Sequence, residues 1–240
     1  MNYPADNYSM DYGQQDLFVA DAAQEERVTF IRRTYAHVAG AVAFFVVLLS
    51  IILNTPSIVQ PLTNLMLGNW WIVLIVFFIA STAAHRMAAT GANPGLQYAG
   101  LAFYALAQAV IFAPFLYLIQ RQMGGDVIMQ SAIFTLMIFG GLTTFVLVTK
   151  SDFSFMRNIL VMGGFAAMAL IVVSLFTSIT LGTWFSGAMI LLMSGFILWE
   201  TSNVLHHYRT DQYVAASLAI FSSLATLFWY VLRFTAAFND

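Results

Sequence analysis

Long apolar segments, separated by short polar breaks, occupy the chain from Tyr35 onward. A helix needs about 20 residues to cross the hydrocarbon core of a bilayer, and each of these segments reaches roughly that length. The breaks carry turn residues, as in Asn54-Thr55-Pro56-Ser57 and Gly124-Gly125-Asp126. The break at 177–181 is the weakest, because a kinked or re-entrant segment would also explain it. The pattern predicts an all-α membrane protein with seven transmembrane helices, at about 35–53, 69–89, 96–119, 127–149, 158–176, 182–205 and 213–235.

Composition supports a membrane protein and excludes several other classes. Hydrophobic residues make up 60% of the chain and charged residues 8%, whereas a soluble domain has roughly 45–50% and 25%. The net charge of -2 argues against a nucleic-acid partner, which would need a clustered basic face. The chain has no cysteine, so disulfides and thiolate zinc sites are excluded. The partner that this composition requires is the lipid bilayer.

The first 26 residues differ from the rest of the chain. They carry six of the eleven acidic residues, no Lys or Arg, and no apolar run. A cleavable signal would need a basic segment followed by an apolar core, and this segment has neither. We therefore expect residues 1–26 to form a disordered acidic cytoplasmic tail, and residues 27–240 to form the seven-helix transmembrane domain.

The placement of Lys and Arg predicts the orientation in the membrane. If seven helices cross, the amino-terminal tail shares one side with the second, fourth and sixth breaks. Lys and Arg concentrate on the cytoplasmic side of membrane proteins, which places the amino terminus inside and the carboxy terminus outside. That side holds seven of the nine basic residues: Arg27, Arg32, Arg33, Arg86, Lys150, Arg157 and Arg209.

Glu200 is the candidate functional residue, because it lies near the end of an otherwise uncharged apolar run that begins at Gly182. A carboxylate near the bilayer centre costs roughly 2.5–3.5 kcal/mol, and less near an interface. Two interpretations remain open: Glu200 extends to the headgroups, or it is a buried acid with a specific partner. Arg86 lies at a matched depth in the span 69–89 and is the candidate partner. Such an ion pair would be either a proton-sensitive latch or a structural clamp.

The last span carries a stripe of small and polar residues on one helical face. Small residues let helix backbones approach closely, and hydroxyl groups form hydrogen bonds between helices. The stripe indicates either a central helix that lines a polar path or a plain packing seam. Its members recur at spacings of three and four residues: Ala215, Ala219, Ser222, Thr226, Tyr230 and Arg233.

Catalysis is not expected from the residues present. A retinal protein needs a lysine inside its last helix, but the single lysine, Lys150, lies in a break. The chain has no H-E-x-x-H pair for a zinc protease. His206 and His207 are adjacent, about 100° apart on a helix, and cannot easily share one metal ion. Neither a cofactor nor a metal site is predicted.

Three motifs make the chain resemble the transmembrane Bax inhibitor motif family. They are Arg32-Arg33-Thr34-Tyr35, Thr149-Lys150-Ser151-Asp152-Phe153-Ser154-Phe155, and Ile197-Leu198-Trp199-Glu200-Thr201-Ser202-Asn203. The last is similar to a proteobacterial branch that carries Glu-Thr-Ser-Asn at this place. The resemblance runs from about Arg32 to Arg233. It implies a seven-helix bundle around a central seventh helix. For a bacterial inner membrane, the orientation derived above puts the carboxy terminus in the periplasm.

The resemblance implies two alternative functions. Members of the similar branch are associated with a membrane-anchored AAA+ metalloprotease, which they modulate. Other members are described as pH-sensitive calcium (Ca²⁺) leak pathways, in which two acidic residues share a proton near an arginine. Carried over, Glu200 takes the first acidic position and Arg86 the arginine, but Ser223 stands at the second acidic position. A serine cannot share a titrating proton, so the resemblance favours the protease modulator over the calcium leak.

Overall fold

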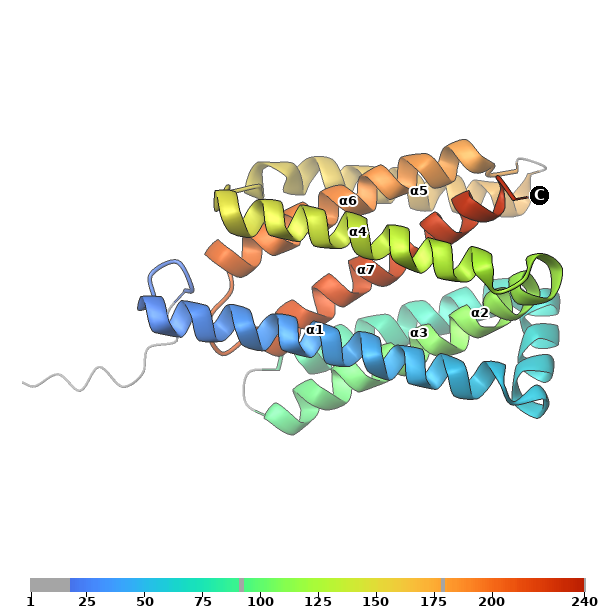
Figure 1. The fold of residues 1–240 in the computed structure, drawn as a ribbon, viewed down its shortest axis with the longest axis horizontal. Coiled ribbons are helices and arrows are strands. Elements are labelled where there is room, and N and C mark those ends of the chain that lie inside the picture. The colour runs from blue at the N-terminus through green and yellow to red at the C-terminus, as the bar shows by residue number, and fades with distance from the viewer. Residues whose placement is uncertain (1–17, 91–92, 178–179, 240) are drawn as a thin grey trace, which may run out of the picture.

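The computed structural model describes residues 18–90, 93–177 and 180–239. Within these residues, seven helices are long and apolar enough to cross a membrane, and together they form one all-α bundle (Figure 1). The prediction of seven transmembrane helices is confirmed. A short 3-10 helix, η1 (Ser154–Met156), precedes the fifth long helix. The seven are α1 (Gln24–Leu53), α2 (Pro56–Ala88), α3 (Pro94–Met123), α4 (Asp126–Thr149), α5 (Arg157–Phe176), α6 (Thr183–His206) and α7 (Tyr213–Ala236).

The polar breaks end the helices by recognisable local chemistry. Pro94 stands at the first helical position of α3, where the side chain of Asn93 accepts a hydrogen bond of 3.3 Å from the Leu96 backbone nitrogen. Lys150 ends α4 in the left-handed conformation, with φ of 53°. The predicted break after Phe176 is confirmed, because α5 and α6 are separate helices. Asn69, with φ of -142°, kinks α2 just where the predicted second span begins.

The seventh helix is the centre of the bundle, as the sequence predicts. Between Tyr213 and Ala236, all of which are described, no residue is exposed. α7 packs against α1, α2, α3, α4 and α6, and Figure 1 shows it crossing behind α4 and α1. Large side chains such as Phe221, Leu224 and Leu227 are buried along it. A helix with no exposed face suits this central position.

The segment before α1 corrects the predicted domain boundary. Val19 is 0% exposed, and its backbone N–H donates a hydrogen bond of 2.9 Å to the carbonyl oxygen of Tyr208. Phe18 forms an isolated antiparallel bridge with Arg209, and α1 already begins at Gln24. Residues 18–26 are therefore ordered, because Val19 is buried beside Phe30. The predicted disorder of residues 1–17 lies outside the described residues.

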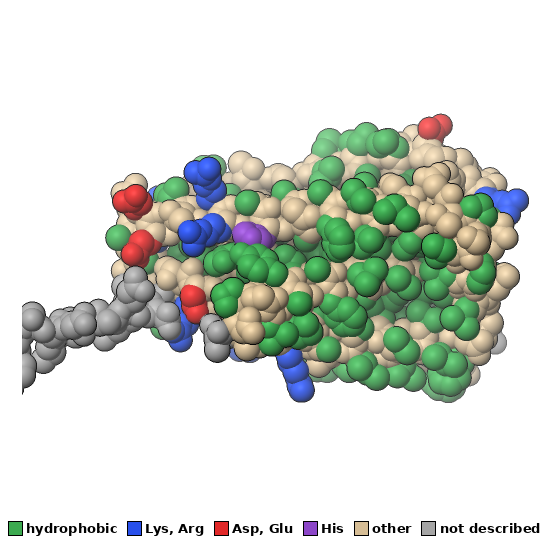
Figure 2. Space-filling view, turned by 90° about the horizontal axis from the view of Figure 1, so that it is seen from below, with side chains coloured by type: hydrophobic (Ala, Val, Ile, Leu, Met, Phe, Trp, Pro, Cys, Tyr) green, Lys and Arg blue, Asp and Glu red, His purple; other side chains and the backbone are tan. Residues whose placement is uncertain are grey.

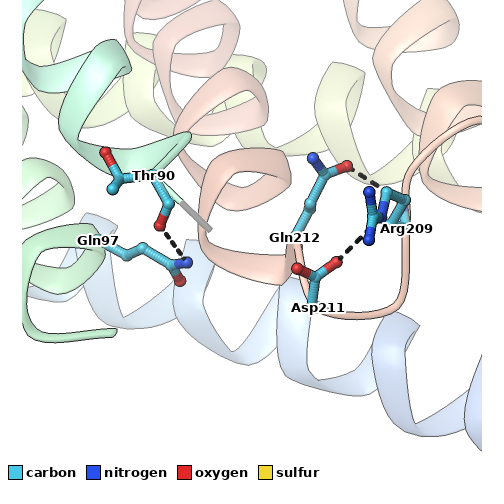
Figure 3. Close-up of polar contacts among 5 residues, drawn as sticks. All are labelled: Thr90, Gln97, Arg209, Asp211 and Gln212. Carbon is cyan, nitrogen blue, oxygen red and sulfur yellow. Dashed lines mark hydrogen bonds and ion pairs between the residues drawn. The ribbon is translucent and has the colours of Figure 1, made fainter. Parts of the chain in front are cut away.

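Two connections at the same end of the bundle are closed by polar contacts. In the α2–α3 connection, the Gln97 side chain donates a hydrogen bond of 2.8 Å to the Thr90 carbonyl oxygen (Figure 3). In the α6–α7 turn, the backbone nitrogen of Arg209 donates to the Gln212 side chain at 3.1 Å. The Arg209 guanidinium also lies 3.7 Å from the Asp211 carboxylate. These contacts fix the ends of α3 and α7 relative to the helices before them.

The lateral surface is apolar, as a lipid-facing surface must be. Figure 2 shows hydrophobic side chains over most of one face, with Lys and Arg side chains gathered toward the left end. Large hydrophobic side chains such as Trp184, Phe176 and Leu191 point outward and are more than half exposed. The protein is a multi-pass membrane protein whose surface suits a lipid bilayer.

Candidate functional site: a buried polar cluster around Glu200

Glu200 lies on the face of α6 that packs into the bundle. It is 8% exposed, and its neighbours Thr201 and Ser202 are fully buried. Ile197, one turn earlier, is also fully buried and fixes the inward direction of this helical face. Glu200 therefore does not extend to the headgroups. The interpretation as a buried acid is the one that the structure supports.

The residue that faces the Glu200 carboxyl group is Ser223 of α7. The structure thus brings together the two positions that the resemblance pairs, although the second carries a hydroxyl group in place of a carboxyl group. Oε2 of Glu200 is buried and has no hydrogen-bond partner in the described chain. A buried oxygen without a hydrogen-bond partner destabilises the fold. A proton, a water molecule or a ligand that bound at Oε2 would therefore be stabilising.

Arg86 does not join this cluster. It is exposed on α2, and no ion pair between Arg86 and Glu200 is found among the described residues. The reason is the direction in which the Arg86 side chain points from the axis of α2. Ala84 and Ala88 are the buried residues of this turn, and Gly100 of α3 packs so closely there that a Cβ atom would lie 2.7 Å from the Ala84 carbonyl oxygen. Arg86 is two residues from each alanine, about 200° around the helix, and points away from the bundle.

A network of hydroxyl groups from α1, α4 and α7 begins at Thr201, the residue after Glu200. The Tyr35 hydroxyl of α1 donates a hydrogen bond of 3.3 Å to the Thr201 side chain and also lies next to Thr143 of α4. The Ser217 hydroxyl of α7 donates to the Thr34 carbonyl oxygen at 2.9 Å. The side-chain oxygens of Thr34 and Thr143 are buried and have no hydrogen-bond partner in the described chain. The site is a polar cluster at the junction of α1, α4, α6 and α7.

Sequence reasoning missed most of this cluster. Thr34 and Tyr35 belong to the Arg32-Arg33-Thr34-Tyr35 motif, which was the available signal for their importance. Thr143 and Ser217 carry no comparable signal, because a lone Thr or Ser in an apolar helix commonly bonds to its own backbone.

The polar stripe of α7 is divided among three environments. The Ser222 hydroxyl lies 2.7 Å from the Tyr104 hydroxyl, and the Thr226 hydroxyl donates to the Ser222 carbonyl oxygen. Tyr230 is buried against Phe185, with ring centroids 5.9 Å apart. The Arg233 guanidinium donates to the Leu181 carbonyl oxygen at 3.1 Å, in the α5–α6 connection. Ser222 thus joins α7 to α3, Thr226 bonds back to Ser222 within α7, and Tyr230 contributes packing.

The loop after α4 is fastened to α6 next to the Glu200 cluster. The Ser202 hydroxyl accepts a hydrogen bond of 2.9 Å from the Phe153 backbone nitrogen and donates one of 3.3 Å to Asp152. Asp152 also accepts a hydrogen bond of 2.8 Å from the Ser154 backbone nitrogen. This last bond is the main reason that the pKa of Asp152 lies below its ordinary value. The second and third sequence motifs therefore touch.

Tyr208, in the turn after α6, covers the cluster from the end of the bundle. Its ring lies 6.5 Å from that of Phe30, measured between centroids. Burial, with a smaller contribution from the charge of Glu200, raises the pKa of the Tyr208 hydroxyl above its ordinary value. The described residues contain no group of three or more His, Cys, Asp or Glu side chains that could hold a metal ion.

Comparison with known proteins decides the family. Residues 27–240 match the family described as "Inhibitor of apoptosis-promoting Bax1". The chain belongs to this Bax inhibitor-like family. The match covers all seven helices except the first three residues of α1, so the buried polar cluster lies wholly within it.

Bacterial and eukaryotic relatives share parts or most of the chain. An uncharacterised protein of Pseudomonas aeruginosa is 29% identical over 224 residues, covering 92% of this chain and 94% of its own length. The Escherichia coli protein named "Modulator of FtsH protease YccA" is 33% identical over 105 residues, covering 43% and 48%. A BI1-like protein of Arabidopsis thaliana is 31% identical over 118 residues, covering 45% and 44%.

Proposed function

We propose that this protein modulates a membrane-anchored AAA+ protease and so takes part in the quality control of membrane proteins. The observation that carries the proposal is its similarity to an E. coli protein whose name is that of a protease modulator, 33% identical over 105 residues. Membership of the Bax inhibitor-like family supports the membrane fold but does not by itself support a protease partner. The proposed role needs no catalytic residue, since a modulator acts by contact.

The end of the bundle that carries most of the Lys and Arg residues is suited to such a contact. Its loops are fixed to one another: the α4–α5 loop is fastened to α6 through Ser202, and the segment before α1 is fastened to the α6–α7 turn through Val19. A preordered surface loses little conformational freedom when a partner binds. We place this end in the cytoplasm of a bacterial inner membrane, with the carboxy terminus in the periplasm, from the distribution of basic residues.

A reconstitution experiment tests the proposal. The purified protein is placed in vesicles with a membrane-anchored AAA+ metalloprotease and a membrane-protein substrate, and degradation is followed with and without it. We expect the protein to co-purify with the protease and to slow degradation. Arg157→Glu, an exposed change at the basic end, should weaken the effect more than Arg121→Glu at the opposite end. Equal degradation rates with and without the protein would refute the proposal.

A second candidate, a pH-sensitive calcium leak, is favoured by one observation. The Glu200 carboxyl group is buried with an unpartnered oxygen, and the side-chain oxygens of Thr34 and Thr143 are also unpartnered. Such a cluster could hold a proton or a dehydrated cation. Because Ser223 cannot supply a second carboxylate, we expect weak calcium flux into protein-containing vesicles, and a larger flux for Ser223→Asp. Strong pH-gated flux from the unmodified protein would favour the leak over the protease modulator.

A further inference from the structure

A groove runs along the outside of the bundle between α1 and α3, away from the Glu200 cluster. It has a volume of about 360 Å³. Small residues create it: an added Cβ atom at Gly40 would meet nothing within 4 Å. Buried apolar side chains form the floor of the groove. Its walls are exposed on the surface that faces the lipid chains. The groove is lined by Ala36, Gly40 and Phe44 of α1 and by Leu101, Ala102 and Ala105 of α3.

A cluster of aromatic and basic side chains closes one end of this groove. The His37 ring, which also lines the groove, stacks on Tyr98 with centroids 5.5 Å apart. The hydroxyl groups of Tyr98 and Tyr213 are 3.0 Å apart, and the Arg33 guanidinium carbon lies 5.7 Å from the centre of the Tyr213 ring. Three helices, α1, α3 and α7, thus contribute to one polar mouth at the basic end of the bundle.

The depth of this mouth matches the headgroup region. α1 has 30 residues and is about 45 Å long at 1.5 Å per residue, whereas the hydrocarbon core is about 30 Å thick. Arg33 is nine residues from the first residue of α1, Tyr98 is the fifth residue of α3, and Tyr213 is the first residue of α7. Figure 2 shows basic side chains gathered toward one end of a largely hydrophobic face. Tyrosine side chains favour this boundary between lipid and water.

The positive charge of Arg33 at the mouth of the groove indicates which kind of molecule binds there. In the part of the chain that the structure describes, Arg33 has no carboxylate partner. Of the two tyrosine hydroxyl groups, one donates to the other, which leaves one O–H free to donate outward. A guanidinium group and a free hydroxyl are donors for a phosphate group. A second copy of α1 would instead bring a second Arg33 against the first, and like charges repel.

We propose that the groove binds one anionic phospholipid, with its phosphate group at Arg33, Tyr98 and Tyr213 and one acyl chain along Gly40 between α1 and α3. Basic pockets between transmembrane helices bind anionic headgroups in this way. His37 positions the mouth: its Nδ1 lies 2.6 Å from the Arg33 carbonyl oxygen, which holds the ring against Tyr98. This inference is independent of the protease partner, because it concerns a different face and a different ligand.

The test is native mass spectrometry of the purified full chain, titrated with phosphatidylglycerol or phosphatidylcholine of identical acyl chains. The wild type should retain one phosphatidylglycerol molecule and prefer it about fivefold over phosphatidylcholine. This factor corresponds to the attraction between one basic residue and an anionic lipid surface. Arg33→Gln should abolish this preference, whereas Arg157→Gln, at the same end but on α5, should keep it. Absence of a preference in the wild type, or its equal loss in both variants, would overturn the proposal.

Filling the groove provides a second, independent measurement. Gly40→Leu should displace the acyl chain and lower retention of phosphatidylglycerol, and the open space around Gly40 means that the fold is kept. Gly140→Leu is the matched control, because a Cβ atom at this exposed position of α4 also meets nothing within 4 Å. If Gly40→Leu leaves lipid retention unchanged but breaks up a dimer, the groove holds a second copy of the chain and the lipid site is refuted.

Discussion

The backbone N–H of Phe153 donates a hydrogen bond of 2.9 Å to the side-chain oxygen of Ser202. The two residues are 49 positions apart in sequence, and each lies in one of the three motifs on which the family resemblance was based. Their contact holds the loop after α4 on α6, within one turn of Glu200. The loop and the buried acid are therefore parts of one structural unit.

We predict that Ser202→Ala destabilises the protein by about 1–3 kcal/mol, because the Phe153 N–H group would lose its partner. Ser174→Ala is the matched control, since within the described residues the Ser174 hydroxyl bonds only to the Ile171 carbonyl oxygen of its own helix. Thermal unfolding in detergent should show a clear drop in Tm for the first variant and little change for the second. Equal Tm values for the two variants would mean that the loop does not depend on Ser202.

The acid dependence of stability should involve Asp152. The pKa of the Asp152 carboxyl group lies below its ordinary value, chiefly because the Ser154 backbone N–H donates to it. A carboxyl group with a lowered folded-state pKa stabilises the fold above the unfolded-state pKa, and this contribution is lost as the pH falls through the folded-state pKa. Because Asp152 is exposed, solvent screening keeps the effect small. Asp152→Asn should flatten the fall in Tm below about pH 4, measured against the wild type from pH 6 to pH 3. An unchanged acid profile would refute this role.

The contacts of Glu200 can be separated by double-mutant cycles in detergent unfolding. Glu200→Gln and Ser223→Ala should be coupled, since the two side chains face each other. Glu200→Gln and Arg86→Ala should be additive within about 0.5 kcal/mol, because residues without shared partners act independently. Arg86→Ala is the natural control, as it changes an exposed residue at the same end of the bundle. Strong coupling of Arg86 to Glu200 would restore the ion pair expected from the sequence.

Those features of the fold that depend on local patterns could be predicted from the sequence. The seven helices follow from the length of each apolar run. The small and hydroxyl residues of α7 allowed a central helix or a plain packing seam, and only the family resemblance favoured the central position. The cost of a carboxylate in an apolar helix singled out Glu200, although it left open whether the side chain is buried or extends to the headgroups. The inferences about the helices and about Glu200 each need only residues of one helix.

Features that depend on how helices are rotated against each other could not be predicted. The sequence places Arg86 and Glu200 at the same depth in the membrane. The close packing of α2 against Gly100, however, turns Ala84 inward and Arg86 outward. The hydroxyl groups of Tyr35 and Thr143 come together beside Thr201 only because α1, α4 and α6 meet there. Depth along a helix is readable from sequence, whereas rotation about its axis depends on the packing of its neighbours.

The orientation of the chain remains a prediction and can be tested with single cysteines, since the chain has no native cysteine. Ser57→Cys and Asn239→Cys lie in exposed positions at the end opposite most of the basic residues. In intact cells both should react with a maleimide that cannot cross the membrane. Ser151→Cys, in the α4–α5 loop, should react only after the cells are opened. Reaction at Ser151 with protection at Asn239 would reverse the orientation.

The segment before α1 should contribute to stability through Val19. This side chain is fully buried beside Phe30, Val204 and Ile220, so it connects the start of α1 to α6 and α7. Val19→Ala removes two buried carbon atoms and should cost about 1.5–2.5 kcal/mol, the sum of lost burial and a small cavity. Phe18→Ala is the control, because the adjacent Phe18 side chain is 54% exposed. Detergent unfolding should separate the two variants. If Val19→Ala unfolds at the same temperature as Phe18→Ala, the segment rests on the bundle without stabilising it, and the turn at Tyr208 is held by α6 and α7 alone.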